Sequence, residues 1–196
     1  MPTWRQYIEQ LLSENDSIVN YGDFVQTNYY KKYNDLLNNV ELQNILSQNN
    51  IELIFYPHHN VQKMAKCFKT TSKNIKIASK ENYDVATLLK ESKLLITDYS
   101  SVFFDFAYMQ KPMIYYQFDE EEFFAKHYKK GYFDYRDDGF GSVVTKEKDL
   151  IEKIQKVIQN NFEMEEKYKK RIDGFFPLHD RRNCERIVNV IENMSN

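Results

Sequence analysis

The feature that most constrains the fold is an alternation of short apolar runs with longer segments of helical periodicity. The β-prone runs cover residues 51–56 (IELIFY), 74–78 (NIKIA), 93–97 (KLLIT) and 112–117 (PMIYYQ). Short buried strands that alternate with helices are typical of a parallel sheet with helices on both faces. We therefore predict an α/β fold with a Rossmann-like parallel sheet and right-handed crossovers.

The segments between and after these runs carry apolar residues at helical spacing. Helices are predicted over residues 29–48, 84–91, 101–109, 163–172 and 181–194, and another over the segment that contains Leu150, Ile151, Ile154, Val157 and Ile158. A loop-rich stretch is expected between the last β-prone run and Val143. Only 5 Gly and 4 Pro occur in 196 residues, so no flexible linker divides the chain and a single domain, residues 1–196, is expected.

The composition argues against several classes of protein. With 27 Lys and Arg against 29 Asp and Glu, the formal net charge is −2, which excludes a strongly basic nucleic-acid-binding protein but not a local basic patch. No apolar stretch reaches the ~20 residues of a membrane span, and the N-terminus lacks a signal-peptide pattern, so a soluble cytoplasmic protein is expected. The cysteines, Cys67 and Cys184, are far apart and predict packing residues in a reduced compartment, with neither a zinc site nor a disulfide.

Polar residues gather where the predicted strands end. In open α/β sheets ligands bind outside the carboxyl ends of the strands. This rule selects His58 with His59, the turn at residues 98–101 and the loop after Gln117. An imidazole in that place can donate to a phosphate oxygen or transfer a proton, and the alternative is a structural histidine. Two adjacent histidines with no third ligand nearby do not predict a metal site.

The turn TDYSS, residues 97–101, allows two interpretations. Ser100 or Ser101 precedes a predicted helix, where a hydroxyl can cap free backbone N–H groups. The same N–H groups, with the helix dipole, favour an anionic ligand. Capping explains one serine but does not explain why Asp98 and Tyr99 stand in the same turn.

Residues 127–141 (HYKKGYFDYRDDGFG) mix aromatic, basic and glycine residues. Such a loop can wrap a base or a pyrophosphate with its main-chain N–H groups, or it can pack as an aromatic-rich loop on its own sheet. Neither a dinucleotide fingerprint nor a P-loop pattern is present. The basic clusters near Tyr168 and Asp180 are typical of a solvated helix face, and a weak contact with an anionic membrane is the alternative.

Several motifs follow one another in a fixed order: PTWR at residues 2–5, YPHH at 56–59, ITDYSSVFFDFA at 96–107, KPMIYYQFDEEEF at 111–123 and KKGYFDYRDDGFG at 129–141. This series resembles the CDP-glycerol glycerophosphotransferase family, the teichoic-acid primases and polymerases with relatives in capsule synthesis. The resemblance runs from Pro2 to about Arg186. It implies the C-terminal, donor-binding lobe of a two-lobed glycosyltransferase-B fold. The chain is then expected to be part of a longer enzyme whose N-terminal lobe supplies the catalytic base.

The resemblance also implies roles for individual residues. His58 matches the family's second essential histidine and is the expected catalytic residue, with His59 where the family commonly has proline. Substrate binding is expected of the residues that match the first loop, the donor-phosphate turn and a loop facing the donor, namely Arg5, Asp98, Tyr99, Ser100, Ser101, Gly139 and Gly141.

The implied reaction is attack by an acceptor hydroxyl on the distal phosphate of CDP-glycerol or a similar CDP-polyol, with release of CMP. It needs positioned cations and N–H donors, and no metal or other cofactor is implied. The expected partners are this donor and a polymer or lipid-linked acceptor bound through the N-terminal lobe, in the cytoplasm at the inner face of the plasma membrane. The chain alone is expected to be inactive. A nucleotide-sugar glycosyltransferase lobe and a non-catalytic nucleotide-binding module are the alternatives.

Overall fold

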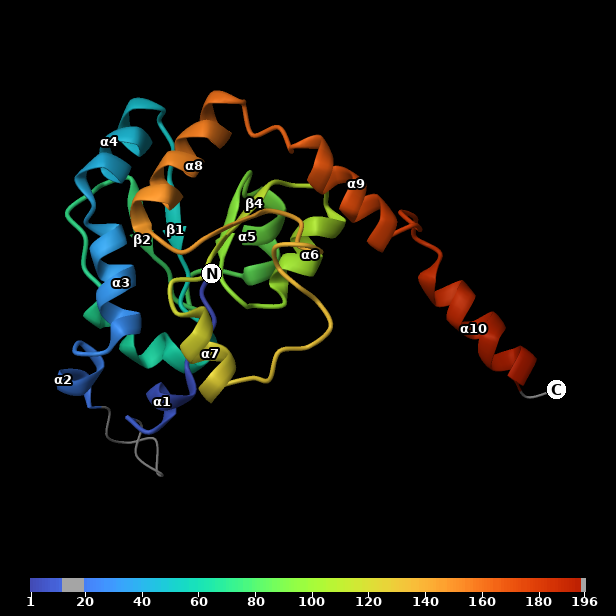
Figure 1. Cartoon of the computed structure of the whole chain (residues 1–196), viewed down its shortest axis with the longest axis horizontal. Helices are drawn as coiled ribbons and strands as arrows, with labels where there is room; N and C mark the ends of the chain where they lie inside the picture. Colours follow the sequence, from blue (N-terminus) through green and yellow to red (C-terminus); the bar gives the residue numbers. More distant parts are fainter. Residues whose placement is uncertain (12–19, 195–196) are drawn as a thin grey trace.

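Helices alternate with short strands along the chain, whose computed structural model describes residues 1–11 and 20–194 (Figure 1). The elements are α1 (Gln6–Glu9), α2 (Tyr21–Phe24), α3 (Asn28–Leu37), α4 (Val40–Gln48), β1 (Leu53–Phe55), the 3-10 helix η1 (His59–Cys67), β2 (Ile75–Ile77), α5 (Val85–Glu91), β3 (Leu95–Thr97), α6 (Val102–Tyr108), β4 (Met113–Tyr116), α7 (Glu120–Lys126), β5 (Ser142–Val144), α8 (Glu147–Gln159), α9 (Glu166–Phe175) and α10 (Asn183–Met194).

The described strands form two parallel sheets. β1 pairs with β2, from Leu53 opposite Ile75 to Phe55 opposite Ile77. In the second sheet β4 lies between β3 and β5 and is parallel to both. The α/β class and the parallel pairing are therefore confirmed. The prediction of one sheet is wrong in this structure, because β1 and β3 do not pair with each other.

Helices cover both faces of the three-stranded sheet. Ile114 and Tyr116 of β4 belong to a core shared with α3, α4 and α8. Met113 and Tyr115, the alternate residues of the same strand, belong to a second core shared with α5, α6 and α9. Successive side chains of a strand point to opposite faces, so β4 divides its residues between the two cores. The prediction of helices on both faces is confirmed.

Residues 29–48 form two helices instead of one. α3 ends at Leu37 and α4 begins at Val40. The side chain of Asn39 accepts a hydrogen bond from the Leu42 N–H at 3.1 Å and caps α4. Asparagine competes with the helical backbone in this way and favours a helix start.

Two helices were not predicted, and one of them lies in the expected loop. α7 occupies part of the stretch after β4, and η1 directly follows His58. The acidic residues Glu120, Glu121 and Glu122 in the first turn of α7 are favoured there by the helix dipole, so they were a signal for this helix.

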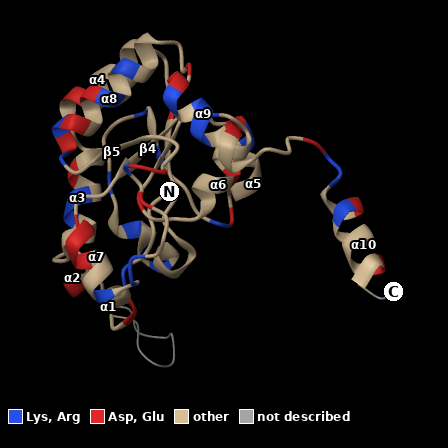
Figure 2. Ribbon diagram, turned by 45° about the vertical axis from the view of Figure 1, so that its right-hand side comes forward, with Lys and Arg blue, Asp and Glu red and all other residues tan. Residues whose placement is uncertain are grey.

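The C-terminal helix α10 extends away from the rest of the molecule (Figure 1) and buries none of its residues. Cys184 on this helix is exposed, so the packing role predicted for it is wrong, whereas Cys67 is half-buried. Arg182 pairs with Glu185 at the start of the helix, as expected of a solvated face. Figure 2 shows charged residues of both signs along the outer helices. In the part of the chain that the structure describes, no helix is both long and apolar enough to cross a membrane.

Candidate functional site

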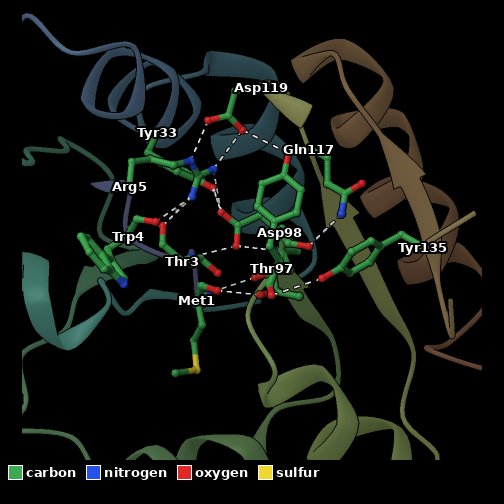
Figure 3. A network of polar contacts seen from close by, with 12 residues as sticks. Met1, Thr3, Trp4, Arg5, Tyr33, Thr97, Asp98, Gln117, Asp119 and Tyr135 are labelled. Atoms are coloured by element: carbon green, nitrogen blue, oxygen red, sulfur yellow. Dashed lines mark hydrogen bonds and ion pairs between the residues drawn. The ribbon is translucent and has the colours of Figure 1, made fainter. Parts of the chain in front are cut away.

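A buried ionic network around Arg5 lies where β3 and β4 end (Figure 3). The Arg5 side chain is 2% exposed. Its Nε and Nη2 donate to the Asp119 carboxylate at 2.7 and 3.0 Å, and Nη2 lies 3.0 Å from Asp98. Its Nη1 donates to the carbonyl oxygen of Thr3 at 2.7 Å. Burial opposes the charge, but attraction to the two carboxylates outweighs it and raises the pKa of Arg5 well above its ordinary value.

Asp98 connects three parts of the chain. Its Oδ1 accepts hydrogen bonds from the N–H groups of Thr3 at 2.7 Å and Tyr99 at 2.6 Å, and its Oδ2 accepts one from the Tyr33 hydroxyl at 3.1 Å. Its carbonyl oxygen accepts from the side-chain amide of Gln117 at 3.0 Å. These bonds tie the first residues of the chain and α3 to the ends of β3 and β4. Asp98 is fully buried, so it acts as a structural anchor here.

Tyr99 belongs to the same network. Its ring stacks on Phe123 of α7, with centroids 3.8 Å apart, and its hydroxyl donates to Asp119 at 3.2 Å. The Arg5 guanidinium carbon lies 5.1 Å from the centre of the Tyr99 ring. Burial, followed by the charge of Asp119, raises the pKa of Tyr99, so this hydroxyl is a hydrogen-bond donor and not a base.

His58 follows β1 at the same ends of the strands and is half-buried. Its Nδ1 accepts a hydrogen bond from the Asn60 N–H at 3.3 Å, which places the imidazole proton on Nε2. Its ring lies 4.0 Å from the ring of His59 and 6.4 Å from that of Trp4. Burial, with the neighbouring His59, lowers the pKa of His58 to about 4. The side chain is therefore a neutral imidazole with an N–H to donate at pH 7.

A histidine that the sequence analysis did not select lies against the same tryptophan. His127 makes an edge contact with Trp4, with ring centroids 4.7 Å apart. Both of its ring nitrogens are buried and make no hydrogen bond to the protein. Burial lowers its pKa. Residues 118–142 were expected to be a loop, so their pattern carried no signal that would place this side chain beside residues 4 and 58.

Ser100 and Ser101 precede α6 on the outer side of the network. Ser100 is half-buried and Ser101 is exposed. Ser101 is the N-cap residue of α6, but its side chain makes no capping hydrogen bond. The capping interpretation therefore does not explain the Ser101 hydroxyl in this structure.

The predicted site residues thus form a buried inner group and an outer group nearer the surface. Arg5, Asp98 and Tyr99 come together as expected, but their polar groups face inward and bond to one another. His58 and the two serines lie nearer the surface. The inner group is therefore placed to support the outer one, and of these residues only His58, Ser100 and Ser101 are accessible from outside.

A known protein family matches this chain over nearly its whole length. The sequence profile of the CDP-glycerol:poly(glycerophosphate) glycerophosphotransferases matches residues 1–193. The chain belongs to this family. Over an alignment of 197 residues it is 36% identical to the minor teichoic acid biosynthesis protein GgaB of Bacillus subtilis, covering 100% of this chain and 21% of GgaB. It is 34% identical over 108 residues to a teichoic acid poly(glycerol phosphate) polymerase of the same organism, covering 55% of this chain and 14% of that protein.

The structure of the wall teichoic acid polymerase TagF shares the fold. It superimposes with a TM-score of 0.63 at 21% identity, covering 98% of this chain and 42% of that one. A TagF structure soaked with CDPG gives a TM-score of 0.52 at 22% identity, covering 82% of this chain and 48% of that one. The likeness supports the predicted assignment to one part of a glycosyltransferase-B fold. The chain spans about a fifth of GgaB and less than half of TagF.

The family resemblance implies that Gly139 and Gly141 face the donor, and the structure shows what surrounds each of them. Both are buried. A Cβ on Gly139 would lie 2.0 Å from the carbonyl oxygen of Tyr135, and one on Gly141 would lie 2.2 Å from that of Met113. Met113 begins β4, so Gly141 lies at the opposite end of the strand from the ionic network. Both glycines allow close packing, and contact with the donor stays a prediction for them.

We expect Gly141→Ala to destabilise the protein. The added Cβ would meet the Met113 carbonyl oxygen, so β5 has to move away from β4. Overpacking of this kind costs about 1–3 kcal/mol. Thermal unfolding by circular dichroism measures the loss. Gly131→Ala is the matched control, since nothing lies within 4 Å of its added Cβ. Equal melting temperatures for the two variants would contradict the packing role.

The loop at residues 127–141 packs on the body of the protein. The ring of Phe133 lies 5.3 Å from that of Phe103 in α6, and Phe140 is buried in the same core. The Tyr135 hydroxyl donates to the Tyr99 carbonyl oxygen at 3.2 Å. Phe133, Tyr135 and Phe140 thus pack as the aromatic-rich interpretation predicts, whereas residues 128–132 are exposed. Within residues 1–11 and 20–194, His, Cys, Asp and Glu side chains form no group of three that could hold a metal ion.

Proposed function

We propose that this chain is the donor-binding part of a glycerophosphotransferase that uses CDP-glycerol, or a similar CDP-polyol. The whole enzyme would add polyol phosphate to a teichoic-acid-like or capsular polymer and release CMP. The observation that carries the proposal is the position of His58, Ser100 and Ser101. They lie outside the carboxyl ends of β1 and β3, where open α/β sheets bind ligands, around the Arg5 network.

In the proposed reaction an acceptor hydroxyl oxygen attacks the distal phosphorus of the donor. The bond from that phosphorus to the bridging oxygen breaks, and CMP leaves with the electron pair. The hydroxyl proton goes to a base outside this chain. Negative charge grows on the bridging oxygen, so catalysis depends on hydrogen-bond donors fixed around the pyrophosphate.

The described residues provide such donors. His58 is neutral and carries its proton on Nε2, so it can donate to a phosphate oxygen, including the one that leaves with CMP. The hydroxyls of Ser100 and Ser101 can donate to the other phosphate oxygens. The buried pairs of Arg5 with Asp98 and Asp119 hold the turn that carries these serines. Such preorganisation removes the cost of ordering the donors during the reaction.

The family and the TagF structure soaked with CDPG support a CDP-linked donor. Acceptor binding and any contact with the plasma membrane would belong to the longer protein. The alternatives, a nucleotide-sugar transferase and a non-catalytic binding module, differ from this proposal in donor preference and in turnover.

Calorimetric titration with CDP-glycerol, CDP-ribitol and a UDP-sugar tests the proposal. We expect binding of a CDP-polyol in preference to the UDP-sugar. Ser100→Ala should weaken that binding by about 10- to 100-fold, the value of a hydrogen bond to a charged group. Ser47→Ala, at an exposed position in α4, is the matched control and should leave the affinity unchanged. Preference for the UDP-sugar, or equal affinities for the two serine variants, would overturn the assignment of donor or site.

A further inference from the structure

The crossover from β1 to β2 is strongly basic, although the chain as a whole is slightly acidic. From Leu53 to Lys80 the sequence has six lysines and neither aspartate nor glutamate, so this segment carries a formal charge of +6 against −2 for the whole chain. All six lysines are exposed. A surface with this much charge of one sign attracts partners of the opposite sign.

Helix geometry sets two of these lysines above one another. η1 is a 3-10 helix, which has three residues per turn, so side chains three positions apart lie on the same side. Lys63 and Lys66 therefore share one side of η1, whereas Val61 and Met64 are buried on another. Lys69 follows two residues after the end of the helix and is also exposed.

Hydrogen bonds bring lysines from two other parts of the chain to this column. The Lys80 N–H donates to Gln62 Oε1 at 3.2 Å, which sets the turn after β2 beside η1. The Lys69 N–H donates to Asn34 Oδ1 of α3 at 3.3 Å. Lys31 precedes Asn34 by three positions, so it is a neighbour on the surface of the same helix, and it is exposed. These residues form a surface that we call the lysine face: Lys31, Lys63, Lys66, Lys69 and Lys80.

Two nearby groups limit the extent of this surface. Lys76 does not belong to it, because this side chain pairs with Glu52 at 2.6 Å and points away from Ile75, which packs in the core beneath η1. Asp35, four residues after Lys31 on α3, offsets part of the charge at one end. The excess of positive charge therefore lies along η1 and the segment that follows it.

The lysine face begins at the candidate site. η1 directly follows His58, and a rise of about 2.0 Å per residue gives a length of roughly 16 Å from His58 to Lys66. No large apolar side chain is exposed among residues 57–80. Binding in the surface of a lipid bilayer requires such side chains beside the basic ones. The surface therefore suits a flexible chain of phosphate groups better than it suits a membrane.

We propose that the lysine face binds the growing polymer, a chain of phosphodiester groups, beside the site at which each unit is added. This inference rests on the proposed function, in which the product is a polyol-phosphate polymer. The ammonium groups would pair with successive phosphates, while the reacting end of the polymer is held by the rest of the longer protein. Each exposed pair is weak, but pairs made with one chain act together and keep the polymer attached while the donor site is refilled.

Calorimetric titration of the full-length protein with a short poly(glycerol phosphate) chain, in the absence of donor, tests the proposal. The test variant carries Lys66→Glu and Lys69→Glu. The matched control carries Lys169→Glu and Lys170→Glu, which change the net charge equally at exposed positions of α9, on the opposite side of the molecule from α3 (Figure 1). Vesicles of phosphatidylglycerol replace the polymer in a second arm, and CDP-glycerol replaces it in a third. Melting temperatures establish that both variants are folded.

The polymer should bind the unchanged protein and the control variant equally, and the test variant about tenfold or more weakly. Added salt should weaken binding steeply, because pairing of lysine with phosphate releases counterions. CDP-glycerol should bind all three proteins alike, so failure of the donor arm alone counts against the proposed function and failure of the polymer arm alone counts against the lysine face. The proposal is overturned if the polymer does not bind or if both variants lose affinity equally. It is also overturned if the vesicles, and not the polymer, depend on Lys66 and Lys69, because a lipid surface would then be the partner.

Discussion

Arg5→Met is expected to lower the free energy of unfolding by about 3–5 kcal/mol at pH 7. Removal of one partner from a buried ionic group leaves the other charges uncompensated. Here the charges left behind are Asp98 and Asp119, which are 0% and 7% exposed. Urea unfolding followed by fluorescence measures the loss.

Arg136→Met is the matched control. Arg136 also pairs with a carboxylate, that of Glu120 at 2.7 Å, but its side chain is 49% exposed. Exposed pairs contribute about 0–1 kcal/mol. If Arg5→Met does not fold, Arg5→Lys keeps a cation but cannot make the same bonds to both carboxylates, so an intermediate loss is expected. A loss in Arg5→Met no greater than in Arg136→Met would show that the network does not hold the site.

His58→Ala is expected to slow CMP release from CDP-glycerol by about 10²- to 10³-fold in the full-length enzyme, the usual cost of removing one hydrogen-bond donor that stabilises growing negative charge. The melting temperature should change little, since the side chain is half-buried. His58→Gln retains an N–H donor, so it should recover part of the rate if hydrogen bonding to phosphate is the main role. No recovery would contradict a role that needs only an N–H donor at this position.

His59→Ala is the control for this experiment, because His59 is adjacent but exposed. Equal loss of rate in the two alanine variants, or no loss in either, would contradict the role of His58.

The pH dependence of the free energy of unfolding gives a second test of the state of His58. The lowered pKa of His58, about 4, means that the unfolded chain binds more protons than the folded one between this value and the ordinary 6.5. Stability should therefore be complete above pH 6.5 and fall as the pH drops toward 4, less steeply in His58→Ala.

Much of the fold followed from local pattern. The β-prone runs at residues 51–56 and 93–97 contain β1 and β3, and the pairing is parallel as predicted. The predicted boundaries of the helices and strands were less accurate. At the break, Asn39 caps α4 through a side-chain hydrogen bond, which helical periodicity does not reveal, and α7 was missed although its acidic first turn was visible.

The candidate site, too, was predicted only in part from the sequence. The rule that ligands lie at the carboxyl ends of strands selected His58 and the turn from Asp98 to Ser101 without any coordinates. It did not show which of these side chains point inward. His127 was missed because its neighbour, Trp4, is far away in sequence. The rule also did not show the packing role of Gly139 and Gly141, because a glycine needed for close packing has the same appearance in sequence as one that admits a ligand.

The sequence by itself determined the α/β class, the order of the elements and the edge at which a ligand is expected, since these depend on residue types and on spacings within single elements. The tertiary structure alone decided that Arg5 binds Asp98 and Asp119 in the interior, and that β1 and β3 do not pair with each other. The physical reason is the range of the interactions. Arg5 and Asp119 are 114 positions apart, and burial turns an ordinary pair of charges into a rigid structural contact only once the strands and helices between them have packed.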